Sequence, residues 1–316
     1  AQGSMRVRVL VIAILLLALW VVELPSQGAS ANASTQASEE LPARARFSHL
    51  TTKQGLSEST VLAIAQDDRG FLWFGTQNGL DRYDGYTIEE FNGPAPLPSK
   101  NIHALLSEGS QLWVGTRGGG LLLLDLSTGN LTVFSSTSEQ EELRPGSNFI
   151  YALFRDTQGR IWVGSDNGLD RLNEEHTAFT HYNIPGAKSQ VVYALAEGTE
   201  GTLWLGTDAG VFQLKVDAPK IETQPAIQID SPPITALWTD TKRNQLWAAT
   251  RGGLYRLDIA SGQTSHFIHD PTDPNSLSSD VTGALFSNQP DRLWVATENG
   301  LDLLDLNSNK VNMHLK

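Results

Sequence analysis

The stretch LWFGTQNGLDRYD, residues 72–84, occurs six times along the chain with small variations. The other copies are LWVGTRGGGLLLLD (112–125), IWVGSDNGLDRLN (161–173), LWLGTDAGVFQLK (203–215), LWAATRGGLYRLD (246–258) and LWVATENGLDLLD (293–305). Their tryptophans, which recur every 40 to 49 residues, are Trp73, Trp113, Trp162, Trp204, Trp247 and Trp294. A repeat of this length in a chain rich in β-forming residues is typical of a β-propeller.

Each copy has the pattern of a tight β-hairpin. An apolar run such as LWVGT leads into a two-residue turn, and a second apolar run follows it. Three of the turn dipeptides are Asn78-Gly79, Asn167-Gly168 and Asn299-Gly300. Because Asn-Gly accepts positive φ at both positions, we expect type I′ turns between two antiparallel strands.

Two further strands complete each repeat. A short apolar run ends eight to ten residues before each tryptophan, and its central alanine recurs in every copy, which fits an innermost strand close to an axis. A fourth run follows the hairpin, for example at 87–91, 131–134, 179–182 and 264–268. We therefore predict an all-β fold, a β-propeller of four-stranded blades over residues 47–316, with six repeats visible.

The N-terminal residues are interpreted as export sequence. Residues 1–4 (AQGS) come before the first methionine and read as a cloning remnant. Residues 5–31 have the features of a secretory signal peptide, with Arg6 and Arg8 ahead of an apolar run at 9–22 and an ASA cleavage pattern at the end. We expect the protein to be exported to the periplasm.

A membrane anchor is the alternative reading of the apolar run. Its 14 residues fall short of the roughly 20 that a helix needs to span a bilayer, so cleavage is favoured. Either reading places the repeats outside the cytoplasm. Residues 32–46 are rich in Ser, Ala and Glu without periodicity, and we expect a flexible linker there.

Residues 47–50 (FSHL) are expected to form a short strand that has no hairpin of its own. Propellers commonly close when such an N-terminal strand completes the last blade. The sixth repeat already has a candidate outer strand at 311–316, so it offers no obvious place for this one. We therefore expect the six repeats to be part of a seven-bladed ring that is truncated at the C-terminus.

Composition excludes several classes of function. The chain has no cysteine, which rules out disulfides, thiolate metal sites and a thiol nucleophile. Its formal net charge of -12 argues against nucleic acid or an anionic membrane surface as the partner, since both require basic patches. No phosphate-binding loop or nucleophile motif such as GxSxG is present, so we expect neither a cofactor nor catalysis in this region.

Several segments together resemble one known family. They are FSHL (47–50), GLS (55–57), DRGFLWFGTQNGLDRYDGY (68–86) and the later loop HDPTDPNSLSS (269–279). This combination is similar to the two-component regulator propeller family, from about residue 47 to the C-terminus.

The resemblance implies a periplasmic sensor region of an inner-membrane signalling protein. Members of this kind have two seven-bladed propellers, a small β-sandwich, a transmembrane helix and a cytoplasmic output module. The output is a histidine kinase, often a hybrid one, or a diguanylate cyclase. The resemblance also implies a small molecule such as an oligosaccharide as ligand. The expected partners are the downstream propeller, sandwich and output modules and a second copy in a homodimer.

Three aromatic residues share one register of the innermost strand in consecutive repeats: His103, Tyr151 and Tyr193. One interpretation is packing between neighbouring blades. The other is a lining for the mouth of the central channel, where rings can stack on a sugar. Arg117 and Arg251 lie in hairpin turns on the same face and would meet a ligand carboxylate or sulfate. These five residues are the candidate ligand-binding site.

The remaining polar patterns are interpreted as structural. His266 and His269 fall on a strand that runs into a loop, where residues three apart point to opposite sides, so we expect no metal site. Asp81, Asp170 and Asp302 recur after the hairpin glycine and leucine, which marks them as parts of the blade pattern.

Three functions stay open at this level. The first is a ligand-sensing module of a membrane signalling protein. The second is a platform for protein interaction or dimerisation without a small ligand. The third is a periplasmic propeller enzyme such as a polysaccharide lyase.

Overall fold

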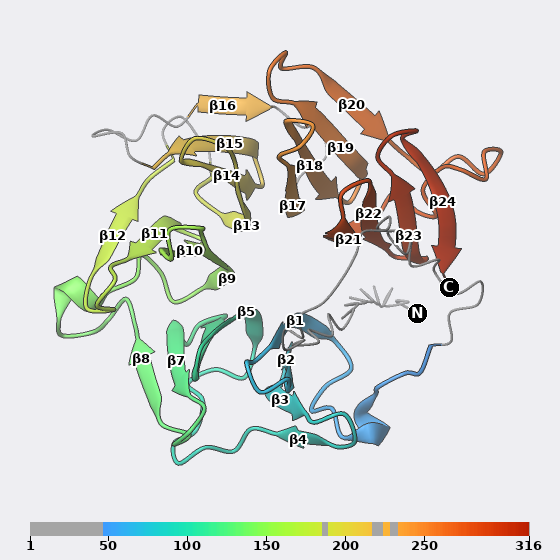
Figure 1. Cartoon of the computed structure of the whole chain (residues 1–316). Helices are drawn as coiled ribbons and strands as arrows, with labels where there is room; N and C mark the ends of the chain where they lie inside the picture. The colour runs from blue at the N-terminus through green and yellow to red at the C-terminus, as the bar shows by residue number, and fades with distance from the viewer. Residues whose placement is uncertain (1–46, 185–188, 217–223, 228–232, 316) are drawn as a thin grey trace, which may run out of the picture.

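The computed structural model describes residues 47–184, 189–216, 224–227 and 233–315. Within these ranges the chain forms six antiparallel sheets of four strands each, arranged as the blades of a propeller (Figure 1). In every blade the strands lie in sequence order from the axis outward. No helix in the described ranges is long and apolar enough to cross a membrane.

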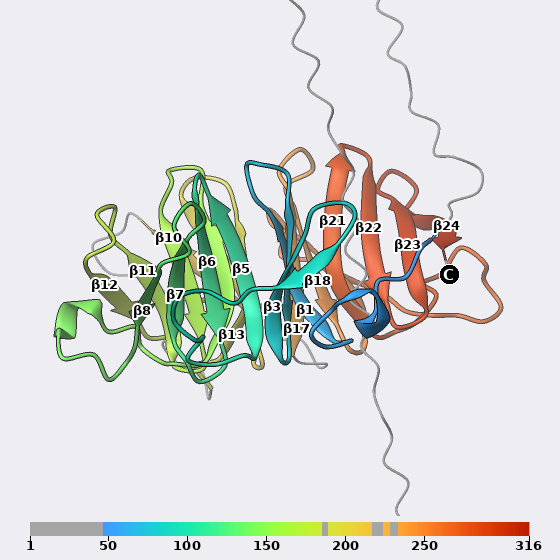
Figure 2. The ribbon, with the colours of Figure 1, turned by 90° about the horizontal axis from the view of Figure 1, so that it is seen from below.

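A short helix, η1 (Thr52–Gln54), precedes the first blade, and another, η2 (Glu141–Leu143), lies between the second and third blades (Figure 2). The strands of the first three blades are β1 (Val61–Gln66), β2 (Leu72–Thr76), β3 (Gly79–Tyr83), β4 (Ile88–Glu90), β5 (Ile102–Glu108), β6 (Gln111–Thr116), β7 (Leu121–Asp125), β8 (Leu131–Phe134), β9 (Ile150–Arg155), β10 (Ile161–Ser165), β11 (Gly168–Leu172) and β12 (Phe179–Tyr182). Those of the last three blades are β13 (Val192–Glu197), β14 (Thr202–Thr207), β15 (Gly210–Lys215), β16 (Gln224–Ile227), β17 (Ile234–Asp240), β18 (Gln245–Thr250), β19 (Gly253–Asp258), β20 (Thr264–Phe267), β21 (Thr282–Gln289), β22 (Arg292–Thr297), β23 (Gly300–Asp305) and β24 (Lys310–Leu315).

The hairpins are confirmed, but the predicted turn type is wrong. Gly168 and Gly300 have positive φ, at 106° and 130°, whereas Asn167 and Asn299 lie outside that region. A type I′ turn would need positive φ at both central residues. The glycine is required instead as the first residue of the returning strand, since a Cβ at Gly168 would lie 2.7 Å from the Tyr182 carbonyl oxygen.

The core lies between the blades. All six repeat tryptophans occupy the second strand of their blade, as predicted. Five of them pack against apolar residues of the following blade; Trp162, for example, shares a cluster with Leu203 and Leu205. Because these five tryptophans pack on the next blade, neighbouring blades stabilise one another.

The ring is open between the sixth blade and the first. Among the described residues, the cluster around Trp294 contains residues of its own blade alone, and Phe286 on β21 is 43% exposed. Figure 1 shows the first and last blades farther apart than the other neighbours. A seventh blade, predicted from the sequence, stays a prediction.

The strand expected at residues 47–50 does not form. No strand of the described chain pairs with this segment, and Phe47 and Leu50 are 43% and 37% exposed. A strand is stabilised by a neighbouring strand, and this segment has none in the open gap.

The recurring aspartates hold the loop that leads into each blade. Asp81, Asp170 and Asp302 are fully buried. Each accepts a hydrogen bond from a loop backbone N–H: Ser57 at 2.9 Å, Gly146 at 2.8 Å and Ser278 at 2.7 Å, respectively. They are structural parts of the blade, as the sequence indicates.

In two blades, a histidine on the fourth strand forms a hydrogen bond with this aspartate. Nδ1 of His181 lies 2.8 Å from Asp170, and Nδ1 of His314 lies 2.7 Å from Asp302. In the first blade Glu90 takes the histidine's cross-strand position, and Oδ1 of Asp81 is buried without a partner in the described chain. Burial, opposed by hydrogen bonds from Ser57 and reinforced by the charge of Glu90, raises the pKa of Asp81.

The His181–Asp170 pair makes stability depend on pH. The hydrogen bond to Asp170 raises the pKa of His181, and burial opposes it only in part. A histidine whose pKa is higher in the folded state contributes stability that is complete below the unfolded pKa of about 6.5 and is lost as pH rises through the folded pKa. We expect His181→Gln to lower the free energy of unfolding more at pH 6 than at pH 8.5, measured by urea denaturation. An equal loss at both pH values would contradict this linkage.

Candidate functional site

Three consecutive blades contribute an aromatic arc at the axis-facing end of the ring, and this region is called the channel mouth below. Antiparallel pairing places the starts of the innermost strands β5, β9 and β13 beside the hairpin turns. His103 on β5 contacts Tyr151 on β9 edge to face, with ring centroids 5.4 Å apart, and Tyr151 contacts Tyr193 on β13 at 5.3 Å. The three rings predicted from a shared register are therefore brought together and partly buried.

Arg117 lies at the same end of the channel. Its backbone N–H donates to the carbonyl of Asn101, just before β5, and Arg117 forms an isolated bridge with Phe149, just before β9. Burial and the charge of Arg117 lower the pKa of His103. The guanidinium therefore lies within electrostatic reach of the aromatic arc.

The second predicted arginine, Arg251, lies within electrostatic reach of Tyr193 in the same arc. Burial is the largest cause that raises the pKa of Tyr193, followed by the charge of Asp208 and by Tyr151, while Arg117 and Arg251 oppose the rise. Both arginines are exposed, and neither guanidinium makes a hydrogen bond or ion pair within the described ranges. The channel mouth therefore has two guanidinium groups, without partners among the described residues, near three aromatic rings.

The sequence analysis did not include Asp208 in the site. Oδ1 of this aspartate is buried and has no hydrogen-bond partner among the described residues. The signal was present, because Asp208 occupies in the fourth repeat the turn position that Arg117 and Arg251 occupy in theirs. With it the mouth offers donors, an acceptor and aromatic faces to one small polar ligand.

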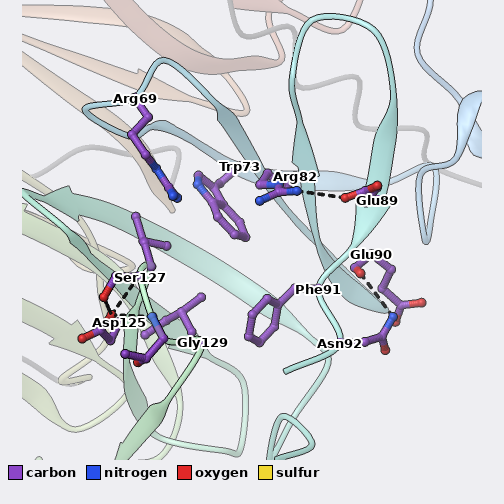
Figure 3. A pocket seen from close by; sticks show the side chains of 13 residues that line it. Arg69, Trp73, Arg82, Glu89, Glu90, Phe91, Asn92, Asp125, Ser127 and Gly129 are labelled. Carbon is purple, nitrogen blue, oxygen red and sulfur yellow. Dashed lines mark hydrogen bonds and ion pairs between the residues drawn. The ribbon is translucent and has the colours of Figure 1, made fainter. Parts of the chain in front are cut away.

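A separate pocket of about 380 Å³ lies between the first and second blades (Figure 3). It is formed at the opposite strand ends, where the β1–β2 and β7–β8 turns lie. Its lining includes Arg69, Trp73, Arg82, Phe91 and the turn that ends at Gly129. No pattern in the sequence analysis indicated it.

Comparison with known proteins agrees with the repeat. The sequence model of the two component regulator propeller matches residues 55–78, 145–167 and 186–209, and these segments contain Trp73, Trp162 and Trp204, respectively. Histidine kinase P4 of Formosa agariphila is 45% identical over 49 residues, which are 15% of this chain and 4% of that protein.

Solved structures share the fold. The extracellular domain of a protein described as a hybrid two-component system from B. thetaiotaomicron superposes with a TM-score of 0.69 at 22% identity, over 85% of this chain and 36% of that one. That of a one-component system from the same organism gives 0.61 at 24%, over 79% and 38%. Virginiamycin B lyase from Staphylococcus aureus gives 0.60 at 16%, over 81% and 85%.

This chain spans little more than a third of the two bacterial extracellular domains. At these identities the structural likeness concerns the fold alone, and the lyase shows that the same fold also serves enzymes. The repeat sequence is more specific than the shared fold, because three of the six repeats match the model of the two component regulator propeller.

Proposed function

We propose that this propeller is the periplasmic ligand-sensing region of a bacterial signal-transduction protein with a histidine kinase or diguanylate cyclase output. The family and the extracellular domains of similar fold support this role. The proposed signal peptide at residues 5–31, which lies outside the described residues, agrees with export. Anchoring of the parent protein in the inner membrane is part of the same proposal.

The ligand site is proposed at the channel mouth. Two features carry this proposal. The rings of His103, Tyr151 and Tyr193 contact one another in series. The guanidiniums of Arg117 and Arg251, which have no partner among the described residues, lie within electrostatic reach of Tyr193. A guanidinium binds a carboxylate or sulfate through two parallel hydrogen bonds, and tyrosine rings stack on the apolar face of a sugar. The ligand class is therefore an acidic oligosaccharide fragment.

Ligand binding would change the signalling state because the ligand has different affinities for the two states of the protein. A ligand shifts a signalling equilibrium only if it binds one state more tightly than the other. Arg117, Arg251 and Asp208 come from turns of three different blades, so one bound ligand would tie these blades together. The proposed signal is the resulting change in packing against the segment that follows the propeller.

A thermal-shift titration tests the site. We expect an acidic disaccharide such as an unsaturated uronate to stabilise the propeller by about 2.7 kcal/mol at 100 times its dissociation constant, and its neutral counterpart to have much less effect. The double variant Arg117→Gln, Arg251→Gln should weaken binding about a hundredfold, since a charge-assisted contact contributes roughly tenfold. Glu298→Gln, in the corresponding turn of the sixth blade, is the control and should bind as the wild type does.

A shift that survives in the arginine double variant would remove the channel mouth as the site. If no acidic or neutral sugar shifts the melting temperature, the protein-interaction or dimerisation role becomes the better proposal, and sedimentation of the folded chain would test it. For this region we propose no catalytic role.

A further inference from the structure

The pocket between the first and second blades has an occupied counterpart in the same molecule. At the next junction, His176 in the turn between β11 and β12 presses its ring edge to face on Trp113, with centroids 4.9 Å apart and planes at 86°. His176 has a φ of 56°. The turn between β7 and β8 faces Trp73 in the same way, but its residue at positive φ is Gly129, at 75°.

At the junction of the first and second blades, no side-chain ring from the β7–β8 turn covers Trp73. Glycine supplies the positive φ that the turn requires but no side chain to cover the tryptophan. The space over Trp73 remains bounded by Phe91, which stands at 62° to the indole with centroids 6.3 Å apart, and by the buried Leu124. The second junction shows that this framework accepts a planar ring.

The polar groups of the pocket differ from those of the second junction. Arg69 and Arg82 flank Trp73 (Figure 3), and both guanidiniums lie over the ring of Phe71, at 5.2 and 5.0 Å. Arg69 uses one side-chain nitrogen on Asp67, and Arg82 uses one on Glu89. Since a guanidinium carries five N–H donors, most of the donors at this wall remain available.

The carboxylates in and beside the pocket already have hydrogen-bond partners. Asp67, behind the lining, is buried and accepts from the Trp73 indole, from two backbone amides and from Arg69. Glu90 bonds Lys100 at 2.8 Å, and Asp125, whose pKa is lowered to about 2 mainly by the Ser127 hydroxyl, is held by its own turn. Glu89 is 64% exposed and is the partner that an incoming anion would displace from Arg82.

We propose that this pocket is a second ligand site, which takes a single planar ring that bears a carboxylate. The ring fills the place that the His176 side chain fills at the next junction, between Trp73, Phe91 and the Gly129 turn. The carboxylate accepts hydrogen bonds from Arg69 and Arg82. The site stands on its own observations and does not depend on the channel mouth.

Three probes of one size test both parts of the proposal: benzoate, benzamidine and benzyl alcohol, titrated against the whole chain by calorimetry and saturation-transfer NMR. We expect benzoate to bind at least tenfold more tightly than either of the others. Arg82→Gln should weaken benzoate about tenfold, and Glu89→Gln should strengthen it, because it removes the competing carboxylate.

The location of the benzoate site is tested by a substitution that places a side chain in the pocket. Gly129→His should abolish benzoate binding, since it supplies the missing ring, and a Cβ there meets only the Pro94 side chain, at 3.4 Å. Gly262→His is the matched control: it has a φ of 72° in the equivalent turn of the fifth blade and open space around its Cβ. It should bind benzoate as the wild type does.

Benzoate binding that is unchanged in Gly129→His would overturn the location, and benzamidine binding as tightly as benzoate would overturn the charge preference. Absence of binding by all three probes would overturn the site. Should Gly129→His fail to fold, the double variant Arg69→Gln, Arg82→Gln decides, since unchanged benzoate affinity there contradicts the proposal. The Arg117→Gln, Arg251→Gln variant should leave benzoate binding intact, which separates this site from the channel mouth.

Discussion

Replacing Asp170 with alanine is expected to lower the free energy of unfolding by about 3–5 kcal/mol, measured by urea denaturation. The carboxylate is fully buried and accepts from the Gly146 backbone and from His181. The substitution leaves the Gly146 N–H and the His181 imidazole without their acceptor and opens a gap at a fully buried position. The entry loop of the third blade should therefore detach along with the loss of stability.

Asp166→Ala is the matched control in the same blade. Asp166 lies in the exposed turn two residues before Gly168, and its side chain has no hydrogen bond within the described chain. We expect a change within about 0.5 kcal/mol. A loss below about 1 kcal/mol for Asp170→Ala would mean that the loop clamp contributes little to the fold.

Trp162→Ala is the second substitution with a large expected effect, about 3–5 kcal/mol. The indole is fully buried, packs against Leu203 and Leu205 of the following blade and donates to Asp156 at 2.9 Å. Its removal opens a cavity at a junction between two blades. Chemical denaturation of the wild type and the variant measures the loss.

Trp294→Ala provides the comparison. This tryptophan is the sixth of the series, but its cluster contains residues of its own blade alone. Because no described residue of another blade packs in this cluster, the removal of Trp294 should cost less stability than the removal of Trp162. Equal losses would show that the first and sixth blades are coupled after all, and would contradict the open ring.

Most of the fold follows from local sequence. Residues 131–134 and 179–182 were predicted as outer strands and form β8 and β12 with the same bounds. Strand positions follow from alternating apolar residues and from the recurring tryptophan, which are properties of short segments. The shared register of His103, Tyr151 and Tyr193 also follows from the repeat, because equivalent positions in successive blades lie side by side around the axis.

The sequence by itself therefore determined the strands, the four-stranded blades, the match of three repeats to the propeller model and the aromatic arc at the channel mouth. Tertiary structure alone decided the open junction, the unpaired oxygen of Asp208 and the pocket over Trp73. The physical reason is that each of these depends on contacts between blades. Gly129 and His176 lie in turns of different length, so a sequence comparison does not align them. Only the packing of each turn on the tryptophan of the preceding blade shows that His176 covers Trp113 with its ring, whereas Gly129 leaves a space over Trp73.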